Sequence, residues 1–98
     1  MRTFHLSGNV DHRNSLSARA MLLNELRPRT ALAIDLTGVT HIDSAGLAVL
    51  VQVYCAARKN GCDVHLVNVS HGIRKMIRLA QLEGVFYLQE NLEKPTIH

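Results

Sequence analysis

Aromatic side chains are scarce in this sequence, and neither charge sign dominates. Only 4% of the 98 residues are aromatic, and tryptophan is absent. Proteins that bind nucleic acids usually stack bases on aromatic rings and gather Lys and Arg into dense clusters. Here eleven basic and eight acidic residues leave a net charge of only +3. We therefore expect no nucleic-acid partner.

Cysteine is rarer still, with two residues, and no metal-binding pattern is present. Cys55 and Cys62 show neither a CxxC motif nor the spacing of zinc ligands, and the six histidines show no pairing at metal spacing. We expect two buried or half-buried free thiols in a reducing compartment. The sequence predicts no metal site and no cofactor.

Long hydrophobic runs are missing too. No apolar stretch approaches the roughly 20 residues of a membrane span, and the N-terminal segment 1–5 lacks the apolar core of a signal peptide. We expect a cytoplasmic location without direct membrane insertion. The length and the apolar content of 47% predict one domain over residues 1–98, with 89–98 as a flexible or short helical tail.

Hydrophobic periodicity in the first half predicts alternating strands and helices. A short strand at 2–7 precedes an amphipathic helix at 15–26, which Pro28 ends. The continuous apolar run Ala31–Leu36 is typical of a strand buried on both faces in a parallel sheet covered by helices. Residues 37–41 are expected to form a turn. A helix of about four turns then begins at Ser44 and ends with Gly61 in a left-handed cap.

The second half repeats the alternation. Residues 63–69 read as a strand, and 85–88 as a last edge strand. Between them we expect a helix that Ser70 caps, that Gly84 ends, and whose inner face consists of Ile73, Met76, Ile77 and Ala80. The order predicts a small α/β domain with a mixed or mostly parallel sheet of about four strands and helices packed against it.

The helix that begins at Ser44 is apolar on two sides. One face carries Leu47, Leu50, Val51 and Tyr54, and the opposite side carries Val49 and Val53. A helix that is apolar nearly all round is normally covered on both sides. We expect the Val49 side to contact a neighbouring helix, with an external partner as the alternative.

The candidate functional site is the 43–46 turn, Asp43-Ser44-Ala45-Gly46, where a buried strand passes into this helix. In parallel α/β sheets, ligands and partners are met at the carboxyl ends of strands. Asp43 or Ser44 can cap the helix, which is worth about 1 kcal/mol. An exposed hydroxyl at a helix N-terminus also suits a phosphate, because the free N–H groups and the helix dipole favour negative charge. Asp43 would repel that phosphate, so phosphorylation would change the surface offered to a partner.

An enzyme is the alternative from another class. Ser44 beside Asp43, with His41 nearby, suggests a small hydrolase. Such a site needs a base in contact with the serine hydroxyl, and nothing in the sequence places His41 there. No GxGxxG, Walker, HExxH or Gly-x-Ser-x-Gly motif is present. We therefore expect a protein that is not an enzyme.

The segment Leu32–Val51, with Asp43-Ser44-Ala45-Gly46-Leu47 at its centre, resembles the signature of STAS domains, the fold of bacterial anti-sigma factor antagonists. The similarity continues through 59–61, 64–69 and 70–86. It implies a non-enzymatic switch that binds an anti-sigma factor, itself a serine kinase, and so frees a sigma factor. In such proteins the kinase phosphorylates a Ser or Thr of this turn, which releases the antagonist, and a phosphatase restores it.

Ser44 is the phosphorylation site that this resemblance implies, and the next position departs from the family pattern. Ala45 stands where many members carry a second Ser or Thr. The Asp-Ser-Ala-Gly version also resembles the STAS subunit of bacterial phospholipid-transport ABC systems, which docks on the ATPase without phosphorylation. Residues 72–77 favour the sigma-regulator branch. STAS domains usually begin with a strand pair, whereas only one strand fits before residue 8.

The predicted docking surface extends beyond the turn itself. Asp35 is expected to support the turn from the end of its strand. The basic outer face of the third helix, with Arg78, either steers an acidic partner or is simply solvated. The partner-binding residues predicted in this way are Thr40, His41, Asp43, Ser44, Ala45, Gly46, Leu47, Arg74 and Lys75.

Overall fold

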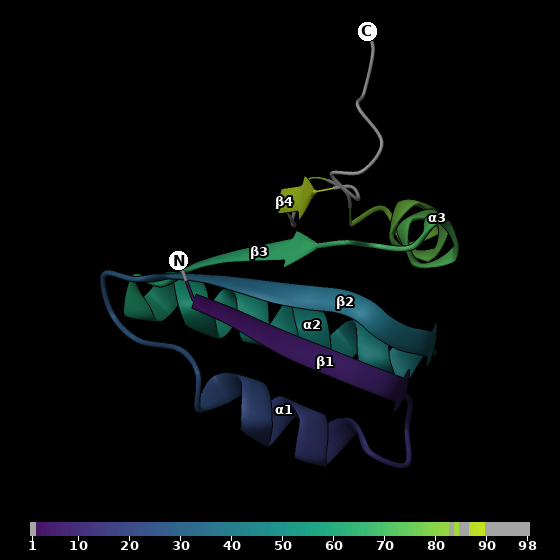
Figure 1. The fold of residues 1–98 in the computed structure, drawn as a ribbon, viewed down its shortest axis with the longest axis horizontal. Coiled ribbons are helices and arrows are strands. Elements are labelled where there is room, and N and C mark those ends of the chain that lie inside the picture. The colour runs from purple at the N-terminus through teal and green to yellow at the C-terminus, as the bar shows by residue number, and fades with distance from the viewer. Residues whose placement is uncertain (1, 83, 85–86, 90–98) are drawn as a thin grey trace, which may run out of the picture.

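A computed structural model describes residues 2–82, 84 and 87–89 of the chain. Four strands form one parallel sheet in the order β1–β2–β3–β4 (Figure 1). The strands are β1 (Arg2–Val10), β2 (Ala31–Ile42), β3 (Asp63–Val67) and β4 (Tyr87–Gln89), and they alternate with the helices α1 (Ser15–Leu23), α2 (Ser44–Asn60) and α3 (His71–Leu79). The predicted α/β class, with about four mostly parallel strands, is confirmed.

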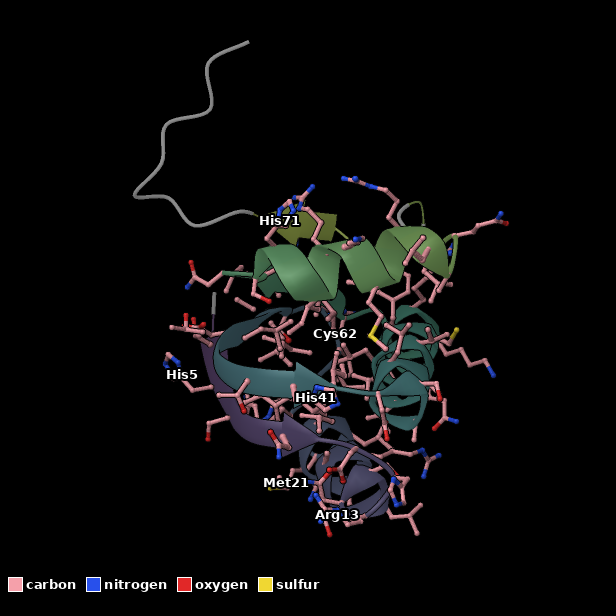
Figure 2. All side chains as sticks on the ribbon, turned by 90° about the vertical axis from the view of Figure 1, so that its right-hand side faces the viewer. His5, Arg13, Met21, His41, Cys62 and His71 are labelled. Atoms are coloured by element: carbon pink, nitrogen blue, oxygen red, sulfur yellow. The ribbon has the colours of Figure 1, made fainter. Side chains whose placement is uncertain are left out.

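The core lies between the sheet and its helices. Figures 1 and 2 show α1 and α2 packed side by side against one face of β1 and β2, with α3 at the β3 end of the sheet. Each helix connects two neighbouring parallel strands, and right-handed crossovers in one direction along a sheet place the connecting helices on one face. The largest fully buried side chains are Leu22, Leu32, Ile34, Leu36, Leu50, Leu66, Ile77, Val10 and Val53.

Strands β1 and β2 are longer than the sequence predicts. The turn expected at 37–41 is wrong, because β2 continues to Ile42 and keeps Val39 buried. β1 continues to Val10 and pairs with β2 to the end of both strands, with shifts in register near Gly8, whose φ is +80°. The glycines at 8 and 38 interrupt the alternation that marks a strand, so local pattern alone stops both strands too early.

Helix ends follow the predictions only in part. α2 begins at Ser44 and ends at Gly61, whose φ of 72° is the expected left-handed cap. α1 ends at Leu23 rather than at residue 26. α3 ends at Leu79, so the cap expected at Gly84 is wrong, and Gln81 takes the left-handed conformation instead.

The remaining strand bounds shift by a residue or more. β3 ends at Val67 rather than at residue 69. β4 covers residues 87–88 of the strand expected at 85–88 and includes Gln89, which was assigned to the tail. Residues 85–86 and the rest of the tail, 90–98, lie outside the described residues.

The second apolar side of α2 is an internal contact. Val49 and Val53 are buried, and α1 packs against α2 with its own buried Ala18 and Leu22. The two valines are therefore buried inside the domain, in a helix that packs on a neighbouring helix, and they offer no surface to an external partner. On the other face Leu47 and Leu50 are buried, whereas Val51 is only half-buried.

The cysteines are both free, but only one is sequestered. Cys62 is buried, as expected, whereas Cys55 is exposed on α2, so the prediction of a buried or half-buried thiol is wrong there. None of the helices in the described part of the chain has the length and apolar character needed to cross a membrane.

Candidate functional site

The 43–46 turn lies against the carboxyl end of β1. The backbone N–H of Asp43 donates to the carbonyl oxygen of Val10 over 3.2 Å. A Cβ on Gly46 would lie 2.3 Å from that same oxygen and 2.7 Å from Cγ1 of Ile42. Real Cβ atoms essentially never come that close. Glycine at position 46 therefore lets the first turn of α2 sit directly on β1 and β2.

Asp43 caps α2, as the sequence predicts. Its Oδ1 accepts the backbone N–H of Gly46 over 2.9 Å, and its Oδ2 accepts the backbone N–H of His12 over 3.1 Å. The His12 imidazole Nδ1 lies 3.4 Å from the same Oδ2. The bond from Gly46 lowers the pKa of Asp43 below its ordinary value, and the bonds from His12 act in the same direction against partial desolvation. At neutral pH the site therefore carries a carboxylate that joins two loops.

A second loop at this edge of the sheet was missed by the sequence analysis. Buried Asp11 accepts bonds from the backbone N–H and the Nη2 of Arg13, over 2.9 and 3.0 Å. Asn14 accepts the N–H of Asp11 over 2.9 Å and donates to the carbonyl oxygen of Asn9 over 2.6 Å. The Asn9 side chain in turn accepts the Thr40 hydroxyl over 2.8 Å. The closely spaced Asx residues at 9, 11 and 14 were the available signal of an ordered loop.

The bond from the Arg13 side chain is the main reason why the pKa of Asp11 lies below its ordinary value. Arg13 and His41 both lie at the edge where the strands end, the side that faces the viewer in Figure 2. The side chains of His12 and Arg13, both in the β1–α1 loop, thus lie near the acidic Asp43.

The predicted site residues differ in what a partner can reach. Thr40, His41 and Ser44 are exposed, and Ala45 is half-buried. Gly46 and Leu47 are buried under the first turn of α2. The hydroxyl of Ser44 is therefore open to solvent, whereas Gly46 and Leu47 are largely covered.

Asp35 does not lie at the turn. Its Oδ1 accepts the N–H and hydroxyl of Thr37, over 2.8 and 2.6 Å, and the side-chain amide of Asn68 over 3.3 Å, while its Oδ2 lies 3.2 Å from Nδ1 of His5. Burial alone would raise the pKa of Asp35, but these hydrogen bonds outweigh it and lower the pKa. Because β2 continues well past this position, Asp35 stabilises the middle of the sheet.

The basic residues of the third helix occupy a separate element. Ser70 caps α3 as predicted, its Oγ accepting the N–H of Ile73 over 3.2 Å. Arg74 is half-buried, and Lys75 and Arg78 are exposed. α3 begins after the carboxyl end of β3, and in a parallel sheet that end lies at the same edge as the 43–46 turn.

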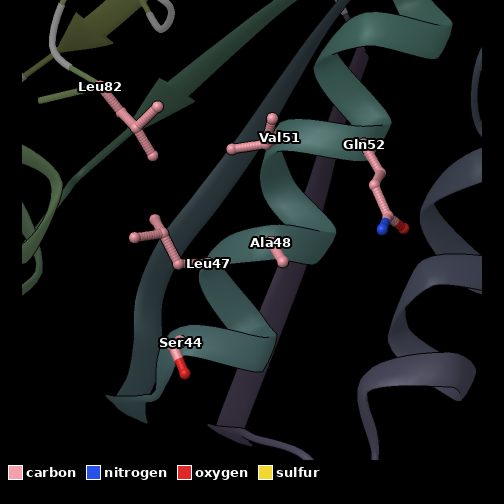
Figure 3. A pocket seen from close by; sticks show the side chains of 6 residues that line it. All are labelled: Ser44, Leu47, Ala48, Val51, Gln52 and Leu82. Carbon is pink, nitrogen blue, oxygen red and sulfur yellow. The ribbon is translucent and has the colours of Figure 1, made fainter. Parts of the chain in front are cut away.

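A groove adjoins the turn on the outer side of α2 (Figure 3). It has a volume of about 370 Å³ and is lined by Ser44, Leu47, Ala48, Val51, Gln52 and Leu82. Five of these residues come from α2, and Leu82 follows α3. The sequence offers no signal for this groove, because nothing local links residue 82 to α2.

The structure does not place, among the residues it describes, a histidine base in contact with Ser44, as the hydrolase alternative would require. The histidine at Asp43 is His12 rather than His41. In the described part of the chain, no hydrogen bond joins a histidine to Ser44, and no group of three or more His, Cys, Asp or Glu could hold a metal ion.

The sequence profile of the STAS domain matches residues 1–94 of the chain. The chain belongs to the STAS domain family. The resemblance carried by Leu32–Val51 is therefore confirmed over nearly the whole length.

Solved structures agree with the STAS fold. A candidate anti-sigma factor antagonist from Thermotoga maritima matches with a TM-score of 0.77 at 16% identity, covering 93% of this chain and 81% of that one. A sulfate transporter family protein from Wolinella succinogenes gives 0.76 at 14% identity, with 94% and 78% covered. The Bacillus cell fate determinant SpoIIAA in its phosphorylated form gives 0.65 at 19% identity, with 93% and 83% covered. At such identities the likeness shows the fold of this STAS domain.

Proposed function

We propose that this STAS domain is a cytoplasmic, non-enzymatic regulator of the anti-sigma factor antagonist type, which binds its partner through the 43–46 turn. The observation that carries the proposal is the exposed hydroxyl of Ser44 on a rigid support. Gly46 holds the turn against β1, and Asp43 caps the helix and binds the β1–α1 loop. The partner is a serine-kinase anti-sigma factor, the class that the resemblance implies.

Phosphorylation of Ser44 is the proposed switch. A phosphoserine carries roughly −1.5 to −2 charges at pH 7, and it would stand next to the Asp43 carboxylate. The Asp43 carboxylate, whose pKa lies below its ordinary value, is ionised at neutral pH and would repel the phosphate. The added charge would alter the one exposed hydroxyl of the turn and release the partner. SpoIIAA, a structural neighbour, has been solved in a phosphorylated form.

Ala45 favours a second candidate function. It leaves Ser44 as the only hydroxyl of the turn and is itself half-buried. A turn of this kind also suits permanent docking, as in a STAS subunit bound to the ATPase of a phospholipid-transport ABC system. In that case the Ser44 hydroxyl acts as a hydrogen-bonding group and is not modified.

Two substitutions at Ser44 separate the candidates. The kinase or ATPase encoded beside the gene is titrated calorimetrically with wild type, Ser44→Asp and Ser44→Ala. A phospho-switch predicts at least tenfold weaker binding for Ser44→Asp, unchanged binding for Ser44→Ala, and loss of kinase-dependent release in Ser44→Ala. Ser17→Asp and Ser17→Ala, at an exposed serine of α1, serve as matched controls.

Three other results would decide against the switch. Wild-type affinity of Ser44→Asp would exclude it. Weaker binding of Ser44→Ala would favour the permanent docking function. Labelling of wild type, but not of Ser44→Ala, by a serine-reactive probe would instead support a hydrolase.

A further inference from the structure

The groove beside α2 continues from the 43–46 turn along two turns of one helix. Its lining positions on α2 are Ser44, then 47 and 48, then 51 and 52, which is one stripe at helical spacing. In Figure 3 Leu47, Val51 and Leu82 point into a common space. A stripe of this kind, bordered by a second wall, is the surface into which an amphipathic helix lays its apolar face.

The chemistry of the groove calls for an apolar side chain. Leu47, Ala48, Val51 and Leu82 offer no polar group, so a buried polar atom of a ligand would lose its hydrogen bonds there. Ser44 and Gln52 provide the polar contacts of the lining. Pockets with an apolar lining and a few polar groups bind an apolar body and fix its orientation by those groups.

Apart from Asp43, which caps α2 beside Ser44, the helices that form the groove carry positive charge only. The groove-lining part of α2, from Ser44 to Gln52, has no charged residue, and Arg58 and Lys59 lie in the last turn of the helix. α3, which leads into Leu82, contains Arg74, Lys75 and Arg78 and again no acidic residue. The backbone N–H of Leu82 donates to the carbonyl oxygen of Ile77 over 3.0 Å. Leu82, which forms the far wall of the groove, is therefore hydrogen-bonded to this basic helix. The basic residues of α3 therefore favour an acidic segment over a basic one on this side of the groove.

We propose that this groove receives the apolar face of an acidic amphipathic helix of the partner protein. The inference rests on the proposed function, because the same partner would touch Ser44 at one end of the groove. It adds an anchor to that function. The turn supplies the contact that modification can change, and the groove holds a Leu- or Phe-like side chain of the partner, the type of contact that dominates binding energy.

Synthetic peptides test the anchor without knowledge of the partner. The probe is a helical peptide with Leu and Phe at i, i+3, i+4 and i+7 and Glu at the outward positions. We expect saturable NMR shifts at Leu47, Ala48, Val51 and Leu82. A peptide with the same apolar pattern and Lys in place of Glu should bind at least tenfold more weakly, and so should one with Ser at the apolar positions.

Matched alanine substitutions locate the binding surface. Ala48→Glu places a carboxylate in the groove and should weaken the acidic peptide at least tenfold. Ala20→Glu makes the same change at an exposed alanine of α1 and should leave the affinity within twofold. Leu82→Ser, which removes the far wall, should resemble Ala48→Glu. Circular dichroism checks that each variant is folded.

Several results would overturn the inference. These are equal binding of the acidic and basic peptides, the absence of shifts in the groove at millimolar peptide, or equal effects of Ala48→Glu and Ala20→Glu. Sedimentation showing that Ala48→Glu dissociates a dimer would assign the groove to a second copy of the chain instead. The kinase or ATPase encoded beside the gene separates the two proposals. If Ser44→Asp weakens its binding while Ala48→Glu does not, the proposed function stands and the groove inference fails. If only Ala48→Glu weakens its binding, the groove inference stands and the phospho-switch fails.

Discussion

At the scale of single residues, Asp43 links two parts of the site that lie 31 positions apart in the chain. One carboxylate oxygen caps α2 and the other holds the β1–α1 loop. Both bonds favour the ionised form, so the pKa of Asp43 is lower in the folded chain than in the unfolded one. A group of this kind stabilises the fold above its unfolded pKa, and that stability is lost as the pH falls.

We therefore predict that Asp43→Asn flattens the acid limb of the stability profile. In wild type the free energy of unfolding should decrease as the pH falls below roughly 4, through the depressed pKa of Asp43. The variant lacks this titration, so it should lose less stability between pH 5 and pH 3, the remainder coming from Asp11 and Asp35. Urea unfolding at several pH values measures the difference. Parallel profiles for the two proteins would contradict the prediction.

At Gly46 the predicted loss of stability comes from steric overlap alone and does not depend on charge or pH. Gly46→Ala should destabilise the fold by about 2 kcal/mol, because the new methyl group would overlap the carbonyl of Val10. Gly72→Ala is the matched control in the first turn of α3, where a Cβ meets nothing within 4 Å, and it should stabilise by up to about 1 kcal/mol. Thermal and urea unfolding of both variants give the comparison. Equal effects would show that Gly46 is not held against β1.

The residues of the site differ in how far the sequence could predict them. Capping by Asp43 follows from residue type and position, because its main bond reaches only three residues along the chain. The contact of Asp43 with His12 depends on β1 and β2 lying side by side. No local pattern contains that information, so His41, which is near in sequence, was the histidine considered.

At the scale of elements, α2 serves two purposes on two sides. α2 packs on α1 and buries Val49 and Val53 inside the fold, whereas the half-buried Val51 lines the groove. The stability of the fold and the proposed binding therefore depend on different valines of one helix.

Two truncations separate these purposes. Val53→Ala should lower the free energy of unfolding by about 2 kcal/mol, since it empties a fully buried site, and should leave the affinity for the acidic peptide unchanged. Compared with Val53→Ala, Val51→Ala should lower the free energy of unfolding less and should weaken binding of the acidic peptide more. Chemical unfolding gives the stability of each variant, and titration with the acidic peptide gives its affinity. A larger peptide effect at Val53 than at Val51 would contradict the assignment of the two sides.

The limits of sequence analysis at this scale are visible at the ends of elements. α2 was placed correctly because a capping Asp and a left-handed Gly frame a long periodic run. The end of β2 was missed because Gly38 and polar side chains at 40 and 41 look like a turn, although β1 pairs with this stretch. The end of α3 was missed because Gln81, not Gly84, adopts the left-handed conformation.

At the scale of the whole molecule, the sheet order follows from the alternation of elements, whereas the groove does not. Short alternating strands and helices with right-handed connections leave few arrangements, and the observed order of four parallel strands is one of them. The groove requires Leu82 to reach α2, which depends on how α3 crosses the fold. The charge is uneven although the net charge of the chain is small, because Arg74, Lys75 and Arg78 gather on α3 with no acidic residue among them.

This uneven charge gives the last prediction. Lys75→Glu reverses an exposed charge on α3, and it should slow association of the acidic peptide about threefold at low salt because electrostatic steering acts mainly on the association rate. Arg19→Glu, at an exposed position of α1, changes the net charge by the same amount and should have a smaller effect. The difference should vanish at about 0.5 M salt, where screening is strong. Stopped-flow measurements at two salt concentrations provide the test. Equal slowing by both variants would mean that net charge, rather than the basic face of α3, attracts an acidic partner.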